Sequence, residues 1–124
     1  MSTNNKILLV EDDADLRFVY ELILSRAGYD ILLARNGKEA LDVLDSHVPR
    51  LILLDIFMPI MDGREFLERL HPGRRKDYAI VVCSNTSEEK IIDTVERLGA
   101  AEIVMKASLD PSGLLNLVAS YMDT

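Results

Sequence analysis

The chain contains five short runs of consecutive apolar residues, in which polar side chains stand only at the ends. The runs cover residues 6–10, 30–34, 51–55, 78–83 and 102–105. A short run of consecutive apolar residues, bounded by glycine, proline or polar residues, is typical of a strand that is buried on both faces. The pattern therefore predicts five strands in the interior of the protein.

Between these runs, apolar residues recur at the spacing of one helix face. Asp13 is placed to cap the first helix and Gly28 to end it. Asp110 followed by Pro111 is typical of a helix start, and these residues open the last helix. The three helices between them are predicted at residues 38–46, 63–70 and 88–98.

Strands alternate with helices along the whole chain, which is the pattern of an α/β protein. Strands that are apolar on both faces require helices on both sides of a parallel sheet, joined by right-handed crossovers. We therefore predict a doubly wound, five-stranded parallel sheet with five helices. The alternation alone leaves the order of the strands open. In such a sheet, ligands bind at the edge where the strands end, in the crevice at which the strand order reverses.

Polar side chains stand at the ends of four of the five predicted strands. Asp12 and Asp13 follow the first strand, and Asp55 ends the third. Ser84 follows the fourth strand and Lys106 the fifth, whereas the second strand offers nothing comparable. Because the carboxyl ends of parallel strands share one edge, we expect these five side chains to form the functional site.

Three carboxylates held close together repel one another, so they raise one another's pKa values or bind a cation. Oxygen ligands without a nearby histidine favour Mg²⁺ over zinc, and Mg²⁺ in proteins usually also contacts a phosphate. The charge of Lys106, added to that of Mg²⁺, would balance the three acids. Such a pocket suits the transfer of a phosphoryl group to a carboxylate, which produces an acyl phosphate.

Length and composition narrow the class of protein. The 124 residues correspond to one domain, residues 1–124, and a hydrophobic content of 48% fits a globular protein. The formal charge of −7 argues against direct binding to nucleic acid or to an anionic membrane. No apolar run approaches the roughly 20 residues of a membrane span, and the chain begins with a polar segment. We expect a cytoplasmic protein without an attached output domain.

Almost the whole chain resembles the receiver domain of bacterial two-component response regulators. The resemblance rests on Asp12-Asp13, Asp55, Met58-Pro59, Asp62-Gly63, Ser84 and Lys106. It implies a flavodoxin-like fold with strand order 2-1-3-4-5. It also implies that Asp55 accepts the phosphoryl group, that Ser84 and Lys106 bind phosphoryl oxygens, and that Mg²⁺ is the cofactor. The metal ligands implied by the family are Asp12, Asp13, Asp55 and the backbone carbonyl of Phe57.

The resemblance further implies the partners of the domain. The phosphodonor would be a histidine kinase or a histidine phosphotransfer protein. Phosphorylation would shift a two-state equilibrium centred on Ser84 and change the binding of an output protein. The domain would act as a stand-alone receiver that catalyses only its own phosphorylation and dephosphorylation. A weak homodimer would form through the fourth helix, the fifth strand and the fifth helix.

Three positions depart from the family pattern. Ile103 stands where the family usually has an aromatic residue whose rotation reports phosphorylation, so that readout requires another device. Ala107 replaces a proline that usually follows the lysine in a cis peptide. Without proline a cis bond costs about 3 kcal/mol, so we expect a trans bond and a shifted loop. Phe57 is bulky and apolar, and we expect it, with Thr86, to screen the attacking water and slow hydrolysis of the phosphorylated form.

Two other functions fit part of the pattern. A scaffold that signals by binding alone typically lacks an acid, the hydroxyl or the lysine, and none is missing here. A metal-dependent phosphohydrolase or phosphotransferase commonly needs a second acid two residues after the first, where this chain has Phe57. We interpret Glu11 as an ion-pair or solvent residue and not as a metal ligand, because consecutive residues in an extended segment point apart. Cys83 lies in an apolar run and is interpreted as a buried, inert thiol.

Overall fold

The computed structural model describes residues 4–70 and 72–123. Within these residues the chain forms one sheet of five parallel strands in the order β2-β1-β3-β4-β5. The strands are β1 (Lys6–Val10), β2 (Asp30–Ala34), β3 (Leu51–Leu54), β4 (Ala79–Ser84) and β5 (Glu102–Met105). The α-helices of the described chain are α1 (Ala14–Arg26), α2 (Gly37–Leu44), α3 (Gly63–Arg69), α4 (Glu89–Arg97) and α5 (Pro111–Met122). The predicted α/β class and the strand order implied by the resemblance are confirmed.

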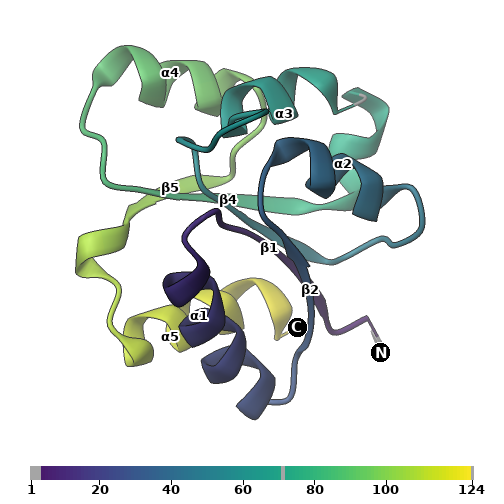
Figure 1. Ribbon diagram of the computed structural model, residues 1–124, viewed down its shortest axis with the longest axis vertical. Coiled ribbons are helices and arrows are strands. Elements are labelled where there is room, and N and C mark those ends of the chain that lie inside the picture. The colour runs from purple at the N-terminus through teal and green to yellow at the C-terminus, as the bar shows by residue number, and fades with distance from the viewer. Residues whose placement is uncertain (1–3, 71, 124) are drawn as a thin grey trace.

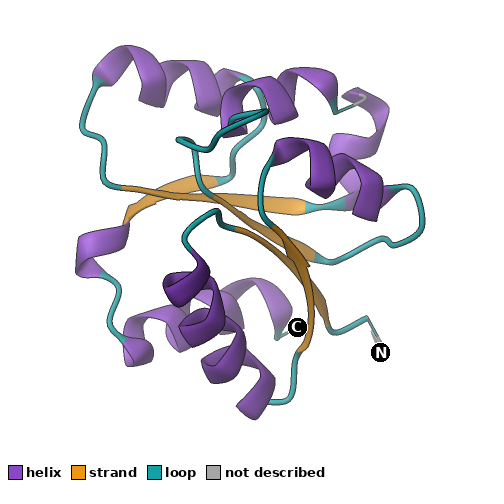
Figure 2. Ribbon diagram, viewed as in Figure 1, coloured by secondary structure: helices purple, strands orange, loops and turns teal. Residues whose placement is uncertain are grey.

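Helices cover both faces of the sheet (Figures 1 and 2). α1 and α5 pack on one face, and α2, α3 and α4 pack on the other. In β3, Leu51 and Leu53 belong to the core on the side of α1 and α5, while Ile52 and Leu54 belong to the core on the side of α2, α3 and α4. No residue of β3 is more than 1% exposed, because helices cover the strand from both sides. Double burial explains the unbroken apolar runs of the three inner strands, β1, β3 and β4, whereas β2 and β5 lie at the edges of the sheet and are partly exposed instead of interior as predicted.

Polar residues fix the starts of the helices at the edge where the strands end. Asp13, Asn36, Asp62 and Asp110 each accept a backbone N–H from the first turn of the helix that follows. Each of these caps lies in the loop after a strand. The loops that connect strands to helices therefore gather at one edge of the sheet, which is where ligands bind in this class of fold.

Some details differ from the predictions. β3 ends at Leu54, one residue before Asp55, and the described chain also contains two 3₁₀ helices, Pro72–Asp77 and Lys106–Ser108, which were not predicted. The Lys106–Ala107 peptide is trans, as expected, and the loop continues as the second of these 3₁₀ turns. Cys83 is buried as predicted, and burial raises the pKa of its thiol to about 12. Among the described helices, none combines the length and the apolar character needed to cross a bilayer.

Candidate functional site

The strand order reverses between β1 and β3, and these two strands end at the same level of the sheet. Val10 is the register partner of Leu54, and the N–H of Asp55 donates to the Val10 carbonyl at 3.1 Å. The residues that directly follow the two strands, Glu11 and Asp55, are therefore brought side by side. Both are acidic and both are buried, with 2% and 7% of their surfaces exposed.

Three carboxylates gather at this point. One oxygen from each of Glu11, Asp12 and Asp55 lies within 4.8 Å of the other two, and Asp12 is the exposed member of the group. Oδ1 of Asp55 accepts the backbone N–H of Ile56 at 2.8 Å, which fixes the orientation of that carboxylate. A group made only of carboxylate oxygens matches the ligand preference of Mg²⁺.

Asp13, which the family pattern assigned to the metal, lies outside this group. Its Oδ1 accepts the N–H groups of Asp15 and Leu16, each at 3.0 Å, so its carboxylate caps α1. The prediction that Asp13 caps the first helix is confirmed. The structure groups Glu11, and not Asp13, with Asp12 and Asp55, because the Asp13 carboxylate is engaged at the helix start. Which of these acids binds the metal stays a prediction.

Glu11 reaches the pocket because the chain bends directly after β1. The argument against Glu11 assumed extended backbone, in which neighbouring side chains point apart. The strand ends at Val10 and Asp12 lies in a bend, so the side chains of Glu11 and Asp12 belong to one group. The sequence did contain a signal that Glu11 belongs to the site, namely its position: Glu11, and not Asp12, is the first residue after the apolar run.

Lys106 bridges two of the three acids. Its Nζ lies 2.5 Å from Oε1 of Glu11 and 3.1 Å from Oδ2 of Asp55, and its side chain is 15% exposed. The other oxygen of Glu11 accepts the N–H of Asp13 at 3.1 Å. The structure thus brings the predicted residues Lys106 and Asp55 together, and it also confirms the ion-pair interpretation of Glu11.

Burial dominates the electrostatics of the pocket. Burial raises the pKa values of Glu11 and Asp55, and the opposing effect of Lys106 does not offset it. Burial by itself would lower the pKa of Lys106, but its hydrogen bonds and ion pairs with the two acids prevail and raise it. The two acids therefore hold their negative charge at a free-energy cost, which a bound cation reduces.

Ser84 ends β4, between the strand that precedes Asp55 and the strand that precedes Lys106. It is 1% exposed, and among the described residues no hydrogen-bond partner reaches its Oγ. A buried hydroxyl without a partner costs about 1–3 kcal/mol, so a ligand that supplies the missing bond is favoured here. The unpaired hydroxyl and the oxygen-only carboxylate group together fit a Mg²⁺ ion accompanied by a phosphoryl group.

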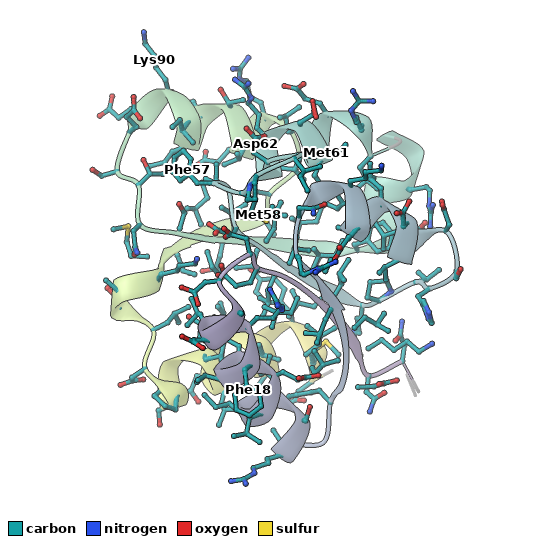
Figure 3. The ribbon with its side chains drawn as sticks, viewed as in Figure 1. Phe18, Phe57, Met58, Met61, Asp62 and Lys90 are labelled. Atoms are coloured by element: carbon teal, nitrogen blue, oxygen red, sulfur yellow. The ribbon has the colours of Figure 1, made fainter. Side chains whose placement is uncertain are left out.

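The loop between β3 and α3 lies beside the site, because Pro59 and Ile60 of this loop line a cavity together with Asp12. Figure 3 shows Phe57, Met58, Met61 and Asp62 together on this loop, next to α3 and α4. Phe57 is 55% exposed. Its side chain lines a cavity of about 200 Å³ together with Ile56, Asp62, Arg64 and Ile91. Among the described residues no hydrogen bond reaches the Phe57 carbonyl, which leaves that oxygen available as a ligand.

Gly63 lets this loop approach the backbone of Asp55 directly after β3. A Cβ at position 63 would overlap the carbonyl oxygen of Asp55, and the Gly63 N–H donates to the Ile56 carbonyl at 2.8 Å. Only glycine permits this contact without displacing backbone. Asp62 accepts the N–H of Glu65 at 2.8 Å and caps α3, so this pair starts the third helix as predicted.

Ile60 holds the tip of the same loop in an unfavourable conformation. Its φ is +70°, and the N–H of Met61 donates to the Pro59 carbonyl at 2.8 Å, which closes a γ-turn around Ile60. A positive φ is rare for a β-branched residue, and a γ-turn of this hand is strained. The side chain is 79% exposed, so its packing compensates little for the strain.

The two remaining predicted tuning residues lie beside α4. Ile103 is half-buried, is the register partner of Val82 and packs against the core between the sheet and α2, α3 and α4. Oγ1 of Thr86 accepts the N–H of Glu88 at 3.2 Å, so the hydroxyl is directed towards the start of α4. The roles assigned to Ile103, Thr86 and Phe57 stay predictions.

Comparison with known sequences finds relatives over most of the chain. A family model for the response regulator receiver domain matches residues 7–119. Sporulation initiation phosphotransferase F of Bacillus subtilis is 33% identical over 97 residues, which cover 78% of this chain and 77% of that protein. The probable transcriptional regulator ycf27 of Guillardia theta is 32% identical over 108 residues, 86% of this chain but only 41% of the regulator. The chain thus spans about two fifths of the length of such regulators.

Solved structures show the same fold. A CheY-like response regulator receiver domain protein from Methanospirillum hungatei superposes with a TM-score of 0.89 at 26% identity, covering 98% of this chain and 95% of the other. The chemotaxis response regulator CheY4 of Vibrio cholerae gives a TM-score of 0.86 at 26% identity, covering 96% and 99% of the two chains.

Proposed function

The chain belongs to the response regulator receiver domain family, and from this premise we propose that Asp55 accepts a phosphoryl group from a phosphohistidine. The donor is a histidine kinase or a histidine phosphotransfer protein. The observation that carries the proposal is the contact of 3.1 Å between Oδ2 of Asp55 and Nζ of Lys106 at the reversal of strand order. Two further carboxylates and the unpaired hydroxyl of Ser84 support it.

Asp55 suits the acceptor role better than the other two acids of the group. Its Oδ1 is fixed by the Ile56 N–H, which leaves Oδ2, the oxygen beside Lys106, to attack phosphorus. Each oxygen of Glu11 likewise has one partner, Lys106 and the Asp13 N–H, but Glu11 is the more buried of the two acids, at 2% exposed against 7% for Asp55. Asp12 is exposed and lies in the bend after β1, so its position is less rigid than that of a residue at the end of a buried strand.

In the transfer, a bond forms between Oδ2 of Asp55 and phosphorus while the bond between phosphorus and the donor imidazole nitrogen breaks. The imidazole leaves with that electron pair and takes up a proton from solvent. Lys106 exchanges its contact with Oδ2 for a phosphoryl oxygen, and Oγ of Ser84 donates to another. When bound, Mg²⁺ neutralises charge on the phosphoryl oxygens and on the carboxylates.

The proposed ligands of the Mg²⁺ ion are Glu11, Asp12, Asp55 and the backbone carbonyl of Phe57. Glu11 takes the place that the family pattern gave to Asp13. The acids form one group with oxygen ligands only, and the carbonyl makes no other hydrogen bond within the described chain. Burial raises the pKa values of Glu11 and Asp55, so a divalent cation that favours their charged forms is expected to lower both.

Exposed apolar residues on α1 suit the phosphodonor, and one of them, Val19, lines a cavity together with Lys106. Phe18, Val19 and Leu22 of α1 are 64%, 46% and 40% exposed, and α1 also buries Tyr20 and Leu24 against the sheet. Figure 3 shows Phe18 on the outer side of α1. A helix that is apolar on both sides is typical of one that becomes covered in a complex. We assign this face to the phosphodonor.

The signalling cycle beyond transfer is likewise a proposal. A two-state shift centred on Ser84, transmitted past Ile103, changes the binding of an output protein, and the weak homodimer uses α4, β5 and α5. The domain acts in the cytoplasm and turns over no separate substrate. The name of the Bacillus subtilis relative, a phosphotransferase of sporulation initiation, is in line with a relay that passes the phosphoryl group on.

The proposal is tested by intact-mass analysis after incubation with acetyl phosphate, with and without Mg²⁺. We expect a Mg²⁺-dependent gain of one phosphoryl group that is lost in Asp55→Asn. The matched control is Asp13→Asn, which removes a neighbouring acid but retains a good helix cap, and it should still gain the group. No gain in the unsubstituted protein, with Mg²⁺ binding verified, would favour a scaffold that signals by binding alone.

A further inference from the structure

The bend after β1 is what makes a metal site from two consecutive residues. In extended backbone the side chains of Glu11 and Asp12 would point to opposite sides, yet their carboxylates lie in one group. A short polar segment of this kind needs contacts that hold it, because ordering each residue costs about 1–2 kcal/mol of backbone entropy. The Asp13 cap fixes the end of the segment at the start of α1.

Arg17 supplies further contacts, in addition to the bond from the Glu11 N–H to the Ala34 carbonyl and the bond from the Asp13 N–H to the Glu11 carboxylate. It lies one turn into α1, and its Nη1 donates to the Glu11 carbonyl at 2.8 Å and to the Asp12 carbonyl at 3.4 Å. Two successive carbonyls thus accept from one guanidinium nitrogen of Arg17, which is a half-buried residue. The backbone N–H of Arg17 also donates to the Asp13 carbonyl at 2.9 Å, as expected within the helix. A planar guanidinium group is suited to holding several acceptors in fixed positions.

We infer that Arg17 is a positioning residue for the metal site. By holding the Glu11 and Asp12 carbonyls on the side of α1, it keeps both carboxylates in the group with Asp55 that would hold Mg²⁺. The inference rests on the proposed metal site. It adds a residue that touches neither the metal nor the phosphoryl group and acts only through the backbone of two ligands.

The direction in which the Kd of Mg²⁺ changes when Arg17 is replaced separates a positioning role from a purely electrostatic one. A guanidinium group near the site repels Mg²⁺, so its removal should tighten metal binding if charge were its only effect. If Arg17 holds the ligands in place, its removal weakens binding instead. Groups that orient metal ligands typically change metal affinity about 10–100-fold when they are replaced.

The experiment measures the Kd of Mg²⁺ by isothermal titration calorimetry for the unsubstituted protein, Arg17→Met, Arg17→Lys and Arg26→Met. Arg26 lies exposed in the last turn of the same helix, so Arg26→Met removes the same charge far from the bend. Far-UV circular dichroism and thermal melting confirm that each variant is folded at the temperature used. Metal binding is measured without any phosphodonor, so the readout does not depend on phosphorylation.

We expect Arg17→Met to weaken Mg²⁺ binding about tenfold or more. Arg17→Lys should show an intermediate Kd because an ammonium group restores the charge and part of the hydrogen bonding. Arg26→Met should bind as the unsubstituted protein does. If Arg17→Met is unfolded, a Kd for Arg17→Lys equal to that of the unsubstituted protein would overturn the inference.

Unchanged or tighter binding in folded Arg17→Met would overturn the inference while leaving the proposed metal site intact. Absence of Mg²⁺ binding in the unsubstituted protein would refute the site itself, and the role of Arg17 with it. The two failures are therefore distinguishable in one set of titrations.

Discussion

Replacing Lys106 with methionine removes the ammonium group that bridges two buried carboxylates. The side chains of Lys106, Glu11 and Asp55 are 15%, 3% and 9% exposed, so water replaces little of the lost interaction. Removing one partner of a buried ion pair costs about 3–5 kcal/mol. Because Lys106 is partly exposed, we expect the lower end of this range, about 3 kcal/mol of the free energy of unfolding at pH 8.

The loss of unfolding free energy in Lys106→Met should be larger at high pH than at low pH. Burial already raises the pKa values of Glu11 and Asp55, and removal of the cation raises them further. An acid whose pKa is higher in the folded than in the unfolded protein favours the folded state when it binds a proton. The destabilisation of Lys106→Met should therefore be largest above these raised pKa values and should shrink as the pH falls through them.

Urea unfolding followed by far-UV circular dichroism measures the effect at pH 8 and pH 5. The matched control is Lys90→Met, since Lys90 lies exposed on α4 and Figure 3 shows its side chain directed away from the fold. This control should change stability by less than about 0.5 kcal/mol. Added Mg²⁺ should recover part of the loss in Lys106→Met by replacing the missing charge. Equal stabilities of the two variants at pH 8 would refute the reasoning.

Three further predictions concern the loop after β3. Phe57→Asn should shorten the lifetime of the phosphorylated protein, measured as loss of the added mass over time, and an unchanged decay rate would exclude a screening role. Gly63→Ala should destabilise the protein by about 1–3 kcal/mol in urea unfolding, because the new Cβ would overlap the Asp55 carbonyl, and a smaller loss would mean that the backbone yields. Ile60→Gly should stabilise the protein by about 0.5 kcal/mol, since relief of about 1–2 kcal/mol of strain exceeds the entropy that glycine adds to the unfolded chain. A thermal midpoint for Ile60→Gly below that of Ile60→Val, which keeps the β-branched side chain, would contradict this estimate.

The sheet could be predicted from the sequence because each strand is a short, mostly apolar run. Only the inner strands β1, β3 and β4 are buried along almost their whole length, whereas the edge strands β2 and β5 leave Leu33 and Met105 38% and 41% exposed. β1, β2 and β5 have the bounds that their apolar runs predict. Once parallel strands are inferred, their carboxyl ends must share an edge, and this topological rule brings Asp55, Ser84 and Lys106 to one place without any knowledge of loops. The order of the strands came from the family resemblance and not from the alternation of elements.

The ligand set could not be predicted with the same certainty, because it depends on backbone dihedrals within a three-residue loop. The residues between Val10 and Ala14 are all acidic, so residue type does not distinguish them. The distinction arises from the bend at Asp12 and from the turn of Asp13 back onto α1. The contact of Arg17 with the Glu11 carbonyl was equally hidden, because an arginine on a helix normally appears as a solvated residue.

The central claim is that Asp55 carries the phosphoryl group, and chemical trapping tests it most directly. Borohydride reduces an acyl phosphate on aspartate to homoserine, so the protein is treated with acetyl phosphate and Mg²⁺, reduced, digested and sequenced by tandem mass spectrometry. The account predicts homoserine at position 55 and unmodified residues at positions 11, 12 and 13. Homoserine at any of the other acidic positions, with residue 55 unmodified, would contradict it.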